Sequence, residues 1–172
     1  IVTNDGDDTV YAGSGNDTII FDAQDYLIDG GTGTDTLVIL DDAVDLALVN
    51  DSIIKNIEII QLDNATGVDF EMTSDDLVAL LESGNTRLII KGSANDSVTL
   101  NDNFGFVSSQ ILDSVSYDVF AKGGNQVWIQ AEITSRVVVP TTPGPDVIPG
   151  TTGDDSVDGG LGDDTVTGGI GN

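Results

Sequence analysis

Aspartates recur at regular intervals near both ends of the chain, in a setting that suits binding of a hard cation. Each follows a turn that contains glycine, and neighbours are nine or eighteen residues apart. A carboxylate in such a turn, with backbone carbonyls that glycine leaves accessible, can supply the roughly six to eight oxygen ligands that Ca²⁺ takes. The recurring aspartates are Asp8, Asp17 and Asp35 in one block and Asp146, Asp155 and Asp164 in the other.

The same spacing predicts the elements that position these carboxylates. An aliphatic residue stands two positions after each aspartate, as in Asp17 and Ile19. Because side chains alternate along a strand, this residue can point into a core. One repeat of nine then makes a turn and a short strand, and two repeats complete a coil of eighteen residues. We therefore expect Asp17 to stack on Asp35 and Asp146 to stack on Asp164, and these are the preferred calcium pairs.

Two positions in this register lack a ligand or a partner. Residues 21–29 keep an aliphatic residue in register but lose the glycines and the aspartate, so the turn at Tyr26 opposite Asp8 predicts a weak or absent site. Either Asp22 or Asp25 could substitute there. Asp155 would need a partner from beyond residue 172. The chain stops within another copy of the repeat, at 168–172, which predicts a longer parent protein.

The best copies, GGTGTDTLV (30–38) and GGLGDDTVT (159–167), resemble the repeats-in-toxin (RTX) nonapeptide, Gly-Gly-x-Gly-x-Asp-x-aliphatic-x. In that family the repeats build a parallel β-roll that holds calcium. The resemblance covers the two ends of the chain and implies Ca²⁺ as the bound ion. The metal ligands it implies, together with those of the register above, are Asp8, Gly15, Asp17, Gly33, Asp35, Asp146, Gly153, Asp155, Gly162 and Asp164, with Asp22, Asp25 and Asp96 as further candidates.

Residues 41–139 lose the nonapeptide but keep many short β-branched segments bounded by Asn, Asp or Gly, which predicts strands. A helix is predicted at 74–82, capped by Thr73 or Ser74. The segment 91–99 has Asp96 where the repeat has its aspartate, and this is either a degenerate calcium turn or a plain hairpin. The predicted strands are 36–40, 44–49, 56–63, 67–72, 87–92, 97–101, 116–121, 126–133 and 136–139.

The sequence thus predicts a mostly β protein, with β-roll or β-solenoid blocks flanking a capping or sandwich segment that contains one short helix. Aromatic residues such as Phe120 and Trp128 could fill a core or cover an open solenoid end, or form a platform for a sugar or peptide. The expected domains are a calcium β-roll (1–40), an intervening β-rich segment (41–139), a Pro-rich linker (140–145) and a second, truncated block (146–172).

The charge of the chain excludes some functions. The formal net charge is −25, with 30 acidic residues, of which 26 are Asp, and only five Lys and Arg. Such an excess opposes compaction unless cations neutralise it, and it excludes nucleic acid as a partner, which needs a basic surface. There is no Cys and no His, and no catalytic constellation is visible. We expect no enzyme and no membrane-spanning segment.

These observations favour a calcium-folded segment near the secretion end of a large protein. The pattern resembles that of bacterial adhesins exported by type I secretion, which implies an extracellular or cell-surface location. Expected partners are calcium ions and neighbouring domains of the same chain. The alternative is a module in 41–139 that binds a glycan or peptide of a host or cell surface. A non-catalytic part of an RTX toxin or secreted hydrolase is a third reading.

Overall fold

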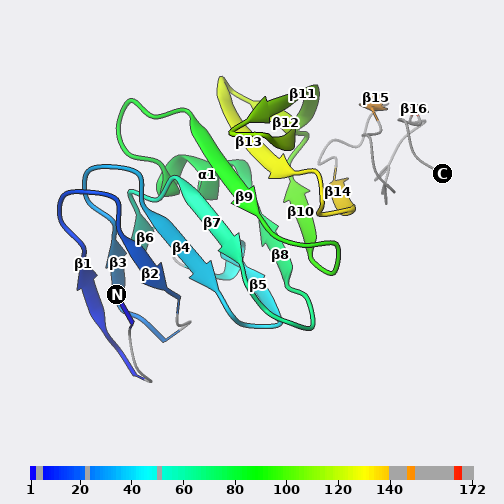
Figure 1. Ribbon diagram of the computed structural model, residues 1–172. Coiled ribbons are helices and arrows are strands. Elements are labelled where there is room, and N and C mark those ends of the chain that lie inside the picture. Colours follow the sequence, from blue (N-terminus) through cyan, green and yellow to red (C-terminus); the bar gives the residue numbers. More distant parts are fainter. Residues whose placement is uncertain (3–5, 22–23, 50–51, 140–146, 150–164, 168–172) are drawn as a thin grey trace.

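The main sheet is built from strands of successive coils that stack in parallel (Figure 1). The computed structural model describes residues 1–2, 6–21, 24–49, 52–139, 147–149 and 165–167. This sheet has seven strands, and the last two join it through antiparallel pairings. In spatial order they are β2 (Thr18–Ile20), β4 (Thr36–Ile39), β7 (Ile59–Leu62), β9 (Arg87–Lys91), β13 (Asn125–Gln130), β12 (Val115–Lys122) and β11 (Gly105–Leu112).

Two further sheets form the other sides of the solenoid. In the first coils the chain alternates between the main sheet and a three-stranded sheet, and from β4 onward it also visits a four-stranded sheet, so the solenoid widens. The parallel, mostly β architecture confirms the predicted fold class. The three-stranded sheet contains β1 (Thr9–Tyr11), β3 (Leu27–Asp29) and β6 (Ile54–Lys55). The four-stranded sheet contains β5 (Ala43–Asp45), β8 (Asp69–Met72), β10 (Ser97–Asn101) and β14 (Ser135–Val139).

The coils lengthen along the chain. Asp17 and Asp35, which meet between the first two coils, are 18 residues apart, whereas Asp35 and Glu58 meet across 23 residues. On another side of the solenoid, Val68 and Asp96 meet across 28 residues. The extra residues accommodate β5, a short 3₁₀ helix (Leu46–Leu48) and the helix α1 (Ser74–Leu80).

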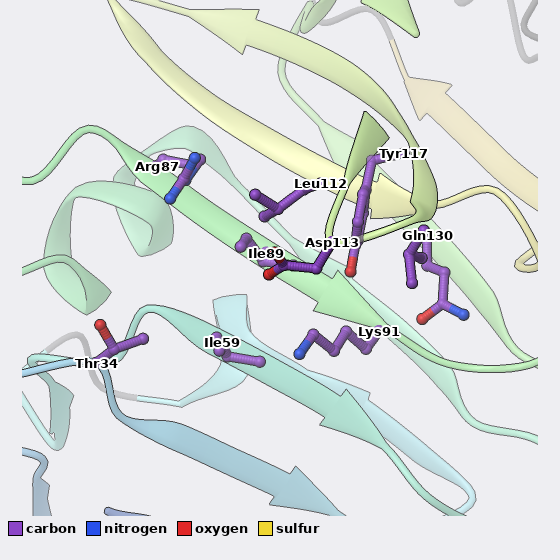
Figure 2. A pocket seen from close by; sticks show the side chains of 10 residues that line it. Thr34, Ile59, Arg87, Ile89, Lys91, Leu112, Asp113, Tyr117 and Gln130 are labelled. Atoms are coloured by element: carbon purple, nitrogen blue, oxygen red, sulfur yellow. The ribbon is translucent and has the colours of Figure 1, made fainter. Parts of the chain in front are cut away.

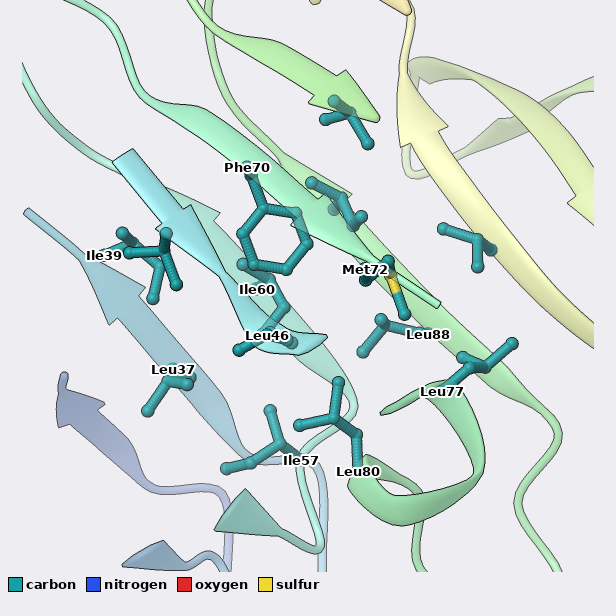
Figure 3. Packing of buried hydrophobic residues seen from close by; sticks show 14 of the residues in the cluster. Leu37, Ile39, Leu46, Ile57, Ile60, Phe70, Met72, Leu77, Leu80 and Leu88 are labelled. Atoms are coloured by element: carbon teal, nitrogen blue, oxygen red, sulfur yellow. The ribbon is translucent and has the colours of Figure 1, made fainter. Parts of the chain in front are cut away.

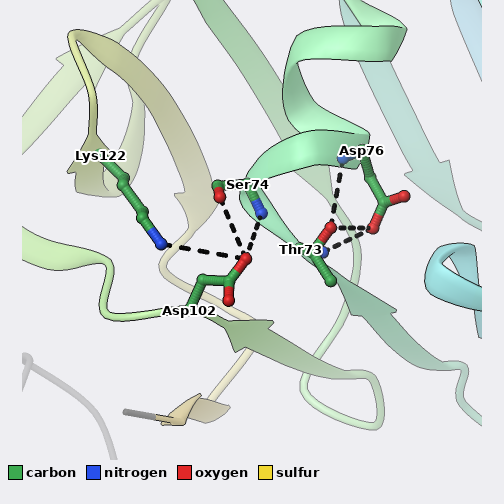
Figure 4. A network of polar contacts seen from close by, with 5 residues as sticks. All are labelled: Thr73, Ser74, Asp76, Asp102 and Lys122. Carbon is green, nitrogen blue, oxygen red and sulfur yellow. Dashed lines mark hydrogen bonds and ion pairs between the residues drawn. The ribbon is translucent and has the colours of Figure 1, made fainter. Parts of the chain in front are cut away.

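The helix α1 takes the place of a strand beside β6, where Ile57 N donates to Leu80 O at 2.8 Å. Its predicted Thr73 cap is confirmed, because Thr73 and Asp76 form a reciprocal capping box. Asp102, at the end of β10, accepts hydrogen bonds from the backbone and hydroxyl of Ser74 and lies 3.9 Å from Lys122 Nζ (Figure 4). The helix start is therefore fixed to the neighbouring coil.

One row of aliphatic side chains runs through the core of the solenoid. It begins with the repeat positions Ile19 and Leu37 and continues, pair by pair in register, through Ile60, Ile90 and Ile129. All five are 0% exposed. Leu37 and Ile60 pack there with residues of the 3₁₀ helix, β8 and α1 (Figure 3). The core position of the nonapeptide thus continues into coils that lack its glycines.

The structure corrects several predicted elements. The strand predicted at 44–49 ends at Asp45, whose carboxylate caps the 3₁₀ helix through Ala47 N. The helix predicted at 74–82 ends at Leu80. Strand β11 was not predicted, because Gly105 and the polar run in its middle break the apolar alternation. The intervening segment also does not form a separate sandwich, since β4 pairs directly with β7. The domain limits remain a prediction, but one sheet crosses the limit at residue 40.

A buried ion pair ties the β11–β12 hairpin to the last coil. Arg136 of β14 lies 3.1 Å from Asp118 of β12, and both side chains are 1% exposed. Arg136 also donates to Ile133 O at 2.5 Å, and Ser109 Oγ of β11 donates to Asp118 Oδ1 at 2.5 Å. This pair therefore connects three strands in the interior.

Candidate calcium sites

The glycine turns at 12–17 and 30–35 stack directly on each other, as their spacing predicts. Gly15 N donates to Thr32 O and Thr32 N donates to Gly13 O, both at 2.9 Å. The strands that follow keep this register, because Ile19 lies opposite Leu37. The stacking places Asp17 one coil away from Asp35, so the two carboxylates of the preferred pair lie at the same corner of the solenoid.

Asp17 and Asp35 present carboxylate oxygens that the protein itself does not satisfy. Asp17 N donates to Asp35 Oδ1 at 2.8 Å, but Oδ2 of each residue is buried and accepts no hydrogen bond from the described residues. Asp35 is 0% exposed, and burial, together with the charge of Asp17, raises its pKa. A buried carboxylate without a partner is costly. The donor chemistry therefore fits Ca²⁺, which prefers carboxylate and carbonyl oxygens.

Gly33 has a stricter requirement for glycine than Gly15, its equivalent in the preceding turn. Both have positive φ, +139° and +116°. A Cβ at Gly33 would lie 2.1 Å from Gly15 O, whereas a Cβ at Gly15 would meet nothing within 4 Å. Gly33→Ala should therefore be destabilising through backbone strain of about 1–3 kcal/mol and through a clash between coils of about 1–3 kcal/mol. Gly15→Ala should show the strain alone.

Urea denaturation of the two variants in saturating calcium measures this difference. Equal losses in the free energy of unfolding would mean that the two turns do not stack as closely as the structure shows.

The turn opposite Asp8 is degenerate in the structure as well. Tyr26 N donates to Asp8 O at 2.8 Å, so the two meet in the expected register, and the Tyr26 side chain is 73% exposed. Asp25 is buried at 5% exposed, and Asp22 lies outside the described residues. A weak or absent calcium site here stays a prediction.

On another side of the solenoid, Asp96 faces Val68 of the neighbouring coil. We call such a position a rung: a backbone N–H of one coil donates to a carboxylate of the next coil, as Asp17 N does to Asp35. Asp96 Oδ1 accepts from Val68 N at 2.8 Å, and its Oδ2 accepts from Ser93 N at 2.5 Å and Ser93 Oγ at 3.0 Å. Both oxygens are thus satisfied by protein donors, and the facing turn supplies a valine where the nonapeptide has aspartate. The plain hairpin is wrong, because β9 and β10 belong to different sheets. The turn is a corner of the solenoid whose carboxylate is satisfied by protein donors, and a calcium role for Asp96 stays a prediction.

The second block is largely outside the described residues. Its strands β15 (Val147–Pro149) and β16 (Thr165–Thr167) pair in parallel, with Ile148 opposite Val166. This pairing has the register expected of one eighteen-residue coil. The candidate ligands Asp146, Gly153, Asp155, Gly162 and Asp164 all lie outside the described residues, so their role stays a prediction.

Glu58 is a residue of this corner that the sequence reasoning missed. Asp35 N donates to Glu58 Oε2 at 2.9 Å, and Glu58 is 6% exposed. The signal was present, because Glu58 precedes the core residue Ile60 by two positions, as Asp35 precedes Leu37. Among the described residues, no group of three or more acidic, His or Cys side chains is arranged to hold a metal. Calcium here would need backbone carbonyls as well.

A pocket of about 370 Å³ lies on the outer face of the main sheet, where the tip of the β11–β12 hairpin folds over β9 (Figure 2). Its floor includes Arg87, Ile89 and Lys91 of β9, and Leu112 and Asp113 of the hairpin tip lie above them. Tyr117 and Gln130 also line it. Burial and the charge of Asp113 raise the pKa of Tyr117, so its hydroxyl stays protonated.

The cations of this pocket are unusual in so acidic a chain. Lys55, Lys122 and Arg136 each pair with an aspartate, but neither Arg87 nor Lys91 pairs with a described carboxylate. Arg87 instead lies over the Trp128 ring, 5.1 Å from its centroid. That face of Trp128 is therefore covered and does not form the open aromatic platform that the sequence allowed.

Comparison with known proteins agrees with the repeats. Residues 1–28 and 141–172 match the RTX calcium-binding nonapeptide repeat, in four copies. The copy at 30–38, with Gly33 and Asp35, lies outside the matched residues. Repeats of this kind bind Ca²⁺. No curated protein sequence and no solved structure matches the chain. None of the helices in the described part is both long and apolar enough to cross a membrane.

Proposed function

Because the chain carries RTX calcium-binding repeats at both ends, we propose that its N-terminal coils are folded by calcium bound between Asp17 and Asp35. The observation that supports this most directly is the pair of buried Oδ2 atoms that no described donor satisfies. A bound Ca²⁺ would supply the positive charge that this corner lacks. Asp17 and Asp35 would hold the ion together with carbonyls of the stacked glycine turns, Gly15 and Gly33 among them.

The same arrangement explains how calcium controls folding. Without the ion, the carboxylates repel one another and burying them opposes folding. Because the ligands come together only when the coils are stacked, an ion that binds them stabilises the folded form alone. Extracellular calcium modules have dissociation constants of about 10⁻⁴–10⁻³ M. The segment would therefore stay open where calcium is scarce and fold where calcium is millimolar.

We place this switch in a large secreted adhesin-like protein exported by type I secretion, in which the segment supports export and stability. RTX repeats suggest an extracellular location. The repeats are structural calcium-binding elements, and we propose no catalytic role. The second block, at 146–172, would fold on its own ions, behind the Pro-rich linker at 140–145.

Asp17→Asn tests the proposed site with little change in shape. The backbone N–H of Asp17 still donates to Asp35, but one carboxylate ligand is lost. We expect calorimetric calcium titration to show weakening of one site by roughly tenfold or more, since calcium affinity depends on the number of charged ligands. The sites of the second block should keep their affinity.

Asp69→Asn is the matched control, because Asp69 is an exposed aspartate of the four-stranded sheet, away from the Asp17 corner, where it accepts a hydrogen bond from Ser97 Oγ of the neighbouring strand. It should leave calcium binding unchanged. Equal weakening by Asp17→Asn and Asp69→Asn would point to general charge rather than to a site, and an unchanged titration for Asp17→Asn would contradict the proposal.

A second candidate function rests on the pocket of Figure 2. We propose that it binds a carboxylated sugar on a cell surface. Arg87 and Lys91 can pair with an anion, Asp113 and Gln130 can bond hydroxyls, and Ile89 offers an apolar surface. Its volume of about 370 Å³ lies within the range of small-ligand pockets, about 300–1,000 Å³.

Binding to an array of acidic and neutral oligosaccharides, in calcium, tests this candidate. We expect binding to acidic glycans that Lys91→Met weakens at least about tenfold, since a charged hydrogen bond contributes about 1.5–3 kcal/mol. Lys122→Met, which removes a cation outside the pocket, serves as the control. Equal binding of Lys91→Met and Lys122→Met to the array would exclude the pocket as the glycan-binding site.

A further inference from the structure

The hydrogen-bond ladder of the calcium corner continues for one rung beyond the glycine turns. Asp17 N donates to Asp35 Oδ1 at 2.8 Å, and Asp35 N donates in the same way to Glu58 Oε2 at 2.9 Å. The backbone repeats this order, because Thr36 N donates to Asp17 O and Ile59 N donates to Asp35 O. Glu58 thus occupies the rung of a nonapeptide aspartate. It lies in a coil without the glycine repeat and, like Asp35, outside the residues that match the RTX family.

The two carboxylates of this rung are buried together. Asp35 is 0% exposed and Glu58 is 6% exposed, and neither Asp35 Oδ2 nor Glu58 Oε1 accepts a hydrogen bond from the described residues. Burial raises the pKa of both carboxyls. The charge of Asp35 raises the pKa of Glu58 further, and a hydrogen bond from the Asn85 side chain offsets this only in part. Two adjacent buried carboxylates need either a proton or a cation to coexist.

A backbone carbonyl reaches the same place. Asn56 O and Asp35 Oδ2 approach Gly30 so closely that a Cβ there would lie 2.1 Å and 2.7 Å from them. The absence of a side chain at Gly30 therefore lets a carbonyl from the Glu58 turn lie beside the Asp35 carboxylate. Lys55, in the same turn, pairs with Asp29 at 3.1 Å.

We propose that Asp35, Glu58 and the carbonyl of Asn56 form a second cation site, selective for Ca²⁺, one coil beyond the repeats. This inference rests on the proposed function, because it makes Asp35 a shared ligand of two successive ions. Carboxylates and carbonyls are hard oxygen donors, and the ligands are contributed by irregular turns, which suits the flexible coordination of Ca²⁺ better than the strict octahedron of Mg²⁺. The longer side chain of Glu58 compensates for the loss of the glycine turn.

Asp96 shows how the same kind of rung looks when no cation is needed. Its Oδ1 accepts from the facing coil, like Asp35 Oδ1, but its Oδ2 accepts from Ser93. Donors of the local turn thus satisfy the second oxygen of Asp96. Asp35 and Glu58 each have one carboxylate oxygen that accepts no hydrogen bond from the described residues. Asp96→Asn is consequently a matched control for a rung carboxylate with a purely structural role.

Glu58→Gln in the full chain tests the site, with ions counted by native mass spectrometry and stability measured with and without calcium. We expect one Ca²⁺ fewer than in the wild type and a smaller rise in melting temperature on adding calcium. In chelator the variant should be at least as stable as the wild type, because the substitution removes the repulsion between Glu58 and Asp35. Asp96→Asn should lower stability equally in both conditions and leave the ion count unchanged.

An unchanged ion count in Glu58→Gln, or an equal loss of stability with and without calcium, would overturn this site while leaving the Asp17–Asp35 site intact. A wild type that binds no calcium would instead overturn the proposed function. Should Glu58→Gln not fold, Glu58→Asp keeps the charge but shortens the reach. Roughly tenfold weaker binding of one ion by that variant supports the site, and wild-type affinity contradicts it.

Discussion

Adding calcium to the chelated protein is expected to raise its melting temperature by roughly 5–10 °C for each occupied site. At a free calcium concentration of about 100 times the dissociation constant, a ligand that binds only the folded state contributes about 2.7 kcal/mol. Each kcal/mol shifts the melting temperature of a chain of this size by about 2–4 °C. The buried oxygens of Asp17 and Asp35 are the atoms on which this gain depends.

Circular dichroism melts in chelator, in calcium and in magnesium measure this effect. Magnesium at the same concentration should give a much smaller shift, because it requires a tighter octahedral shell than turn carbonyls provide. Sodium chloride at matched ionic strength controls for screening of the net charge of −25. If calcium has no greater effect than these controls, calcium-driven folding is wrong.

Removing the buried cation Arg136 is expected to be among the most costly single substitutions. Arg136→Met would leave the Asp118 carboxylate in the interior, with both side chains only 1% exposed in the wild type. Breaking one partner of a buried ion pair costs about 3–5 kcal/mol. The hairpin that carries β11 and β12 should detach from β14, and this loss should persist in saturating calcium.

Urea denaturation of single and double variants separates this effect from simple loss of charge. The double variant Asp118→Leu/Arg136→Met should recover most of the stability, since no charge then remains buried. Lys122→Met removes the partly exposed ion pair between Lys122 and Asp102, whose charged atoms lie 3.9 Å apart. This change should lower the free energy of unfolding by at most about 1 kcal/mol. If Arg136→Met lowers the free energy of unfolding no more than Lys122→Met does, the Arg136–Asp118 pair does not hold the hairpin to the last coil.

The repeat register was the part of the fold that could be predicted from sequence. A fixed period ties each turn to the next, so the pairing of Ile19 with Leu37 follows from spacing alone. The pairing of Leu37 with Ile60 could not be counted in this way, because the coil between them is longer. Beyond residue 40, the sheet is held in register by core packing, which a local pattern does not report.

The candidate site was predictable to the same extent. Aspartates in period identified Asp17 and Asp35 as neighbours, and the structure places them so. Glu58 was missed because its turn lacks glycine and its distance from Asp35 is 23 residues rather than 18. Asp96 shows the reverse case. Its local sequence resembles the repeat and made it a candidate ligand, but the residue that faces it in the neighbouring coil is Val68, which has no oxygen in its side chain to offer. A motif describes one turn, whereas a site requires two.

The lengthening of successive coils predicts a stepwise response to mechanical force. Coils that contact mainly their neighbours can peel away one at a time under tension. At about 3.3–3.6 Å of extended chain per residue, a coil of 18 residues releases about 60 Å, and one of 28 residues releases about 95 Å. A tether built this way would yield in steps of unequal size. If calcium occupies the proposed Asp17–Asp35 site, the force needed for the first steps would rise with the calcium concentration.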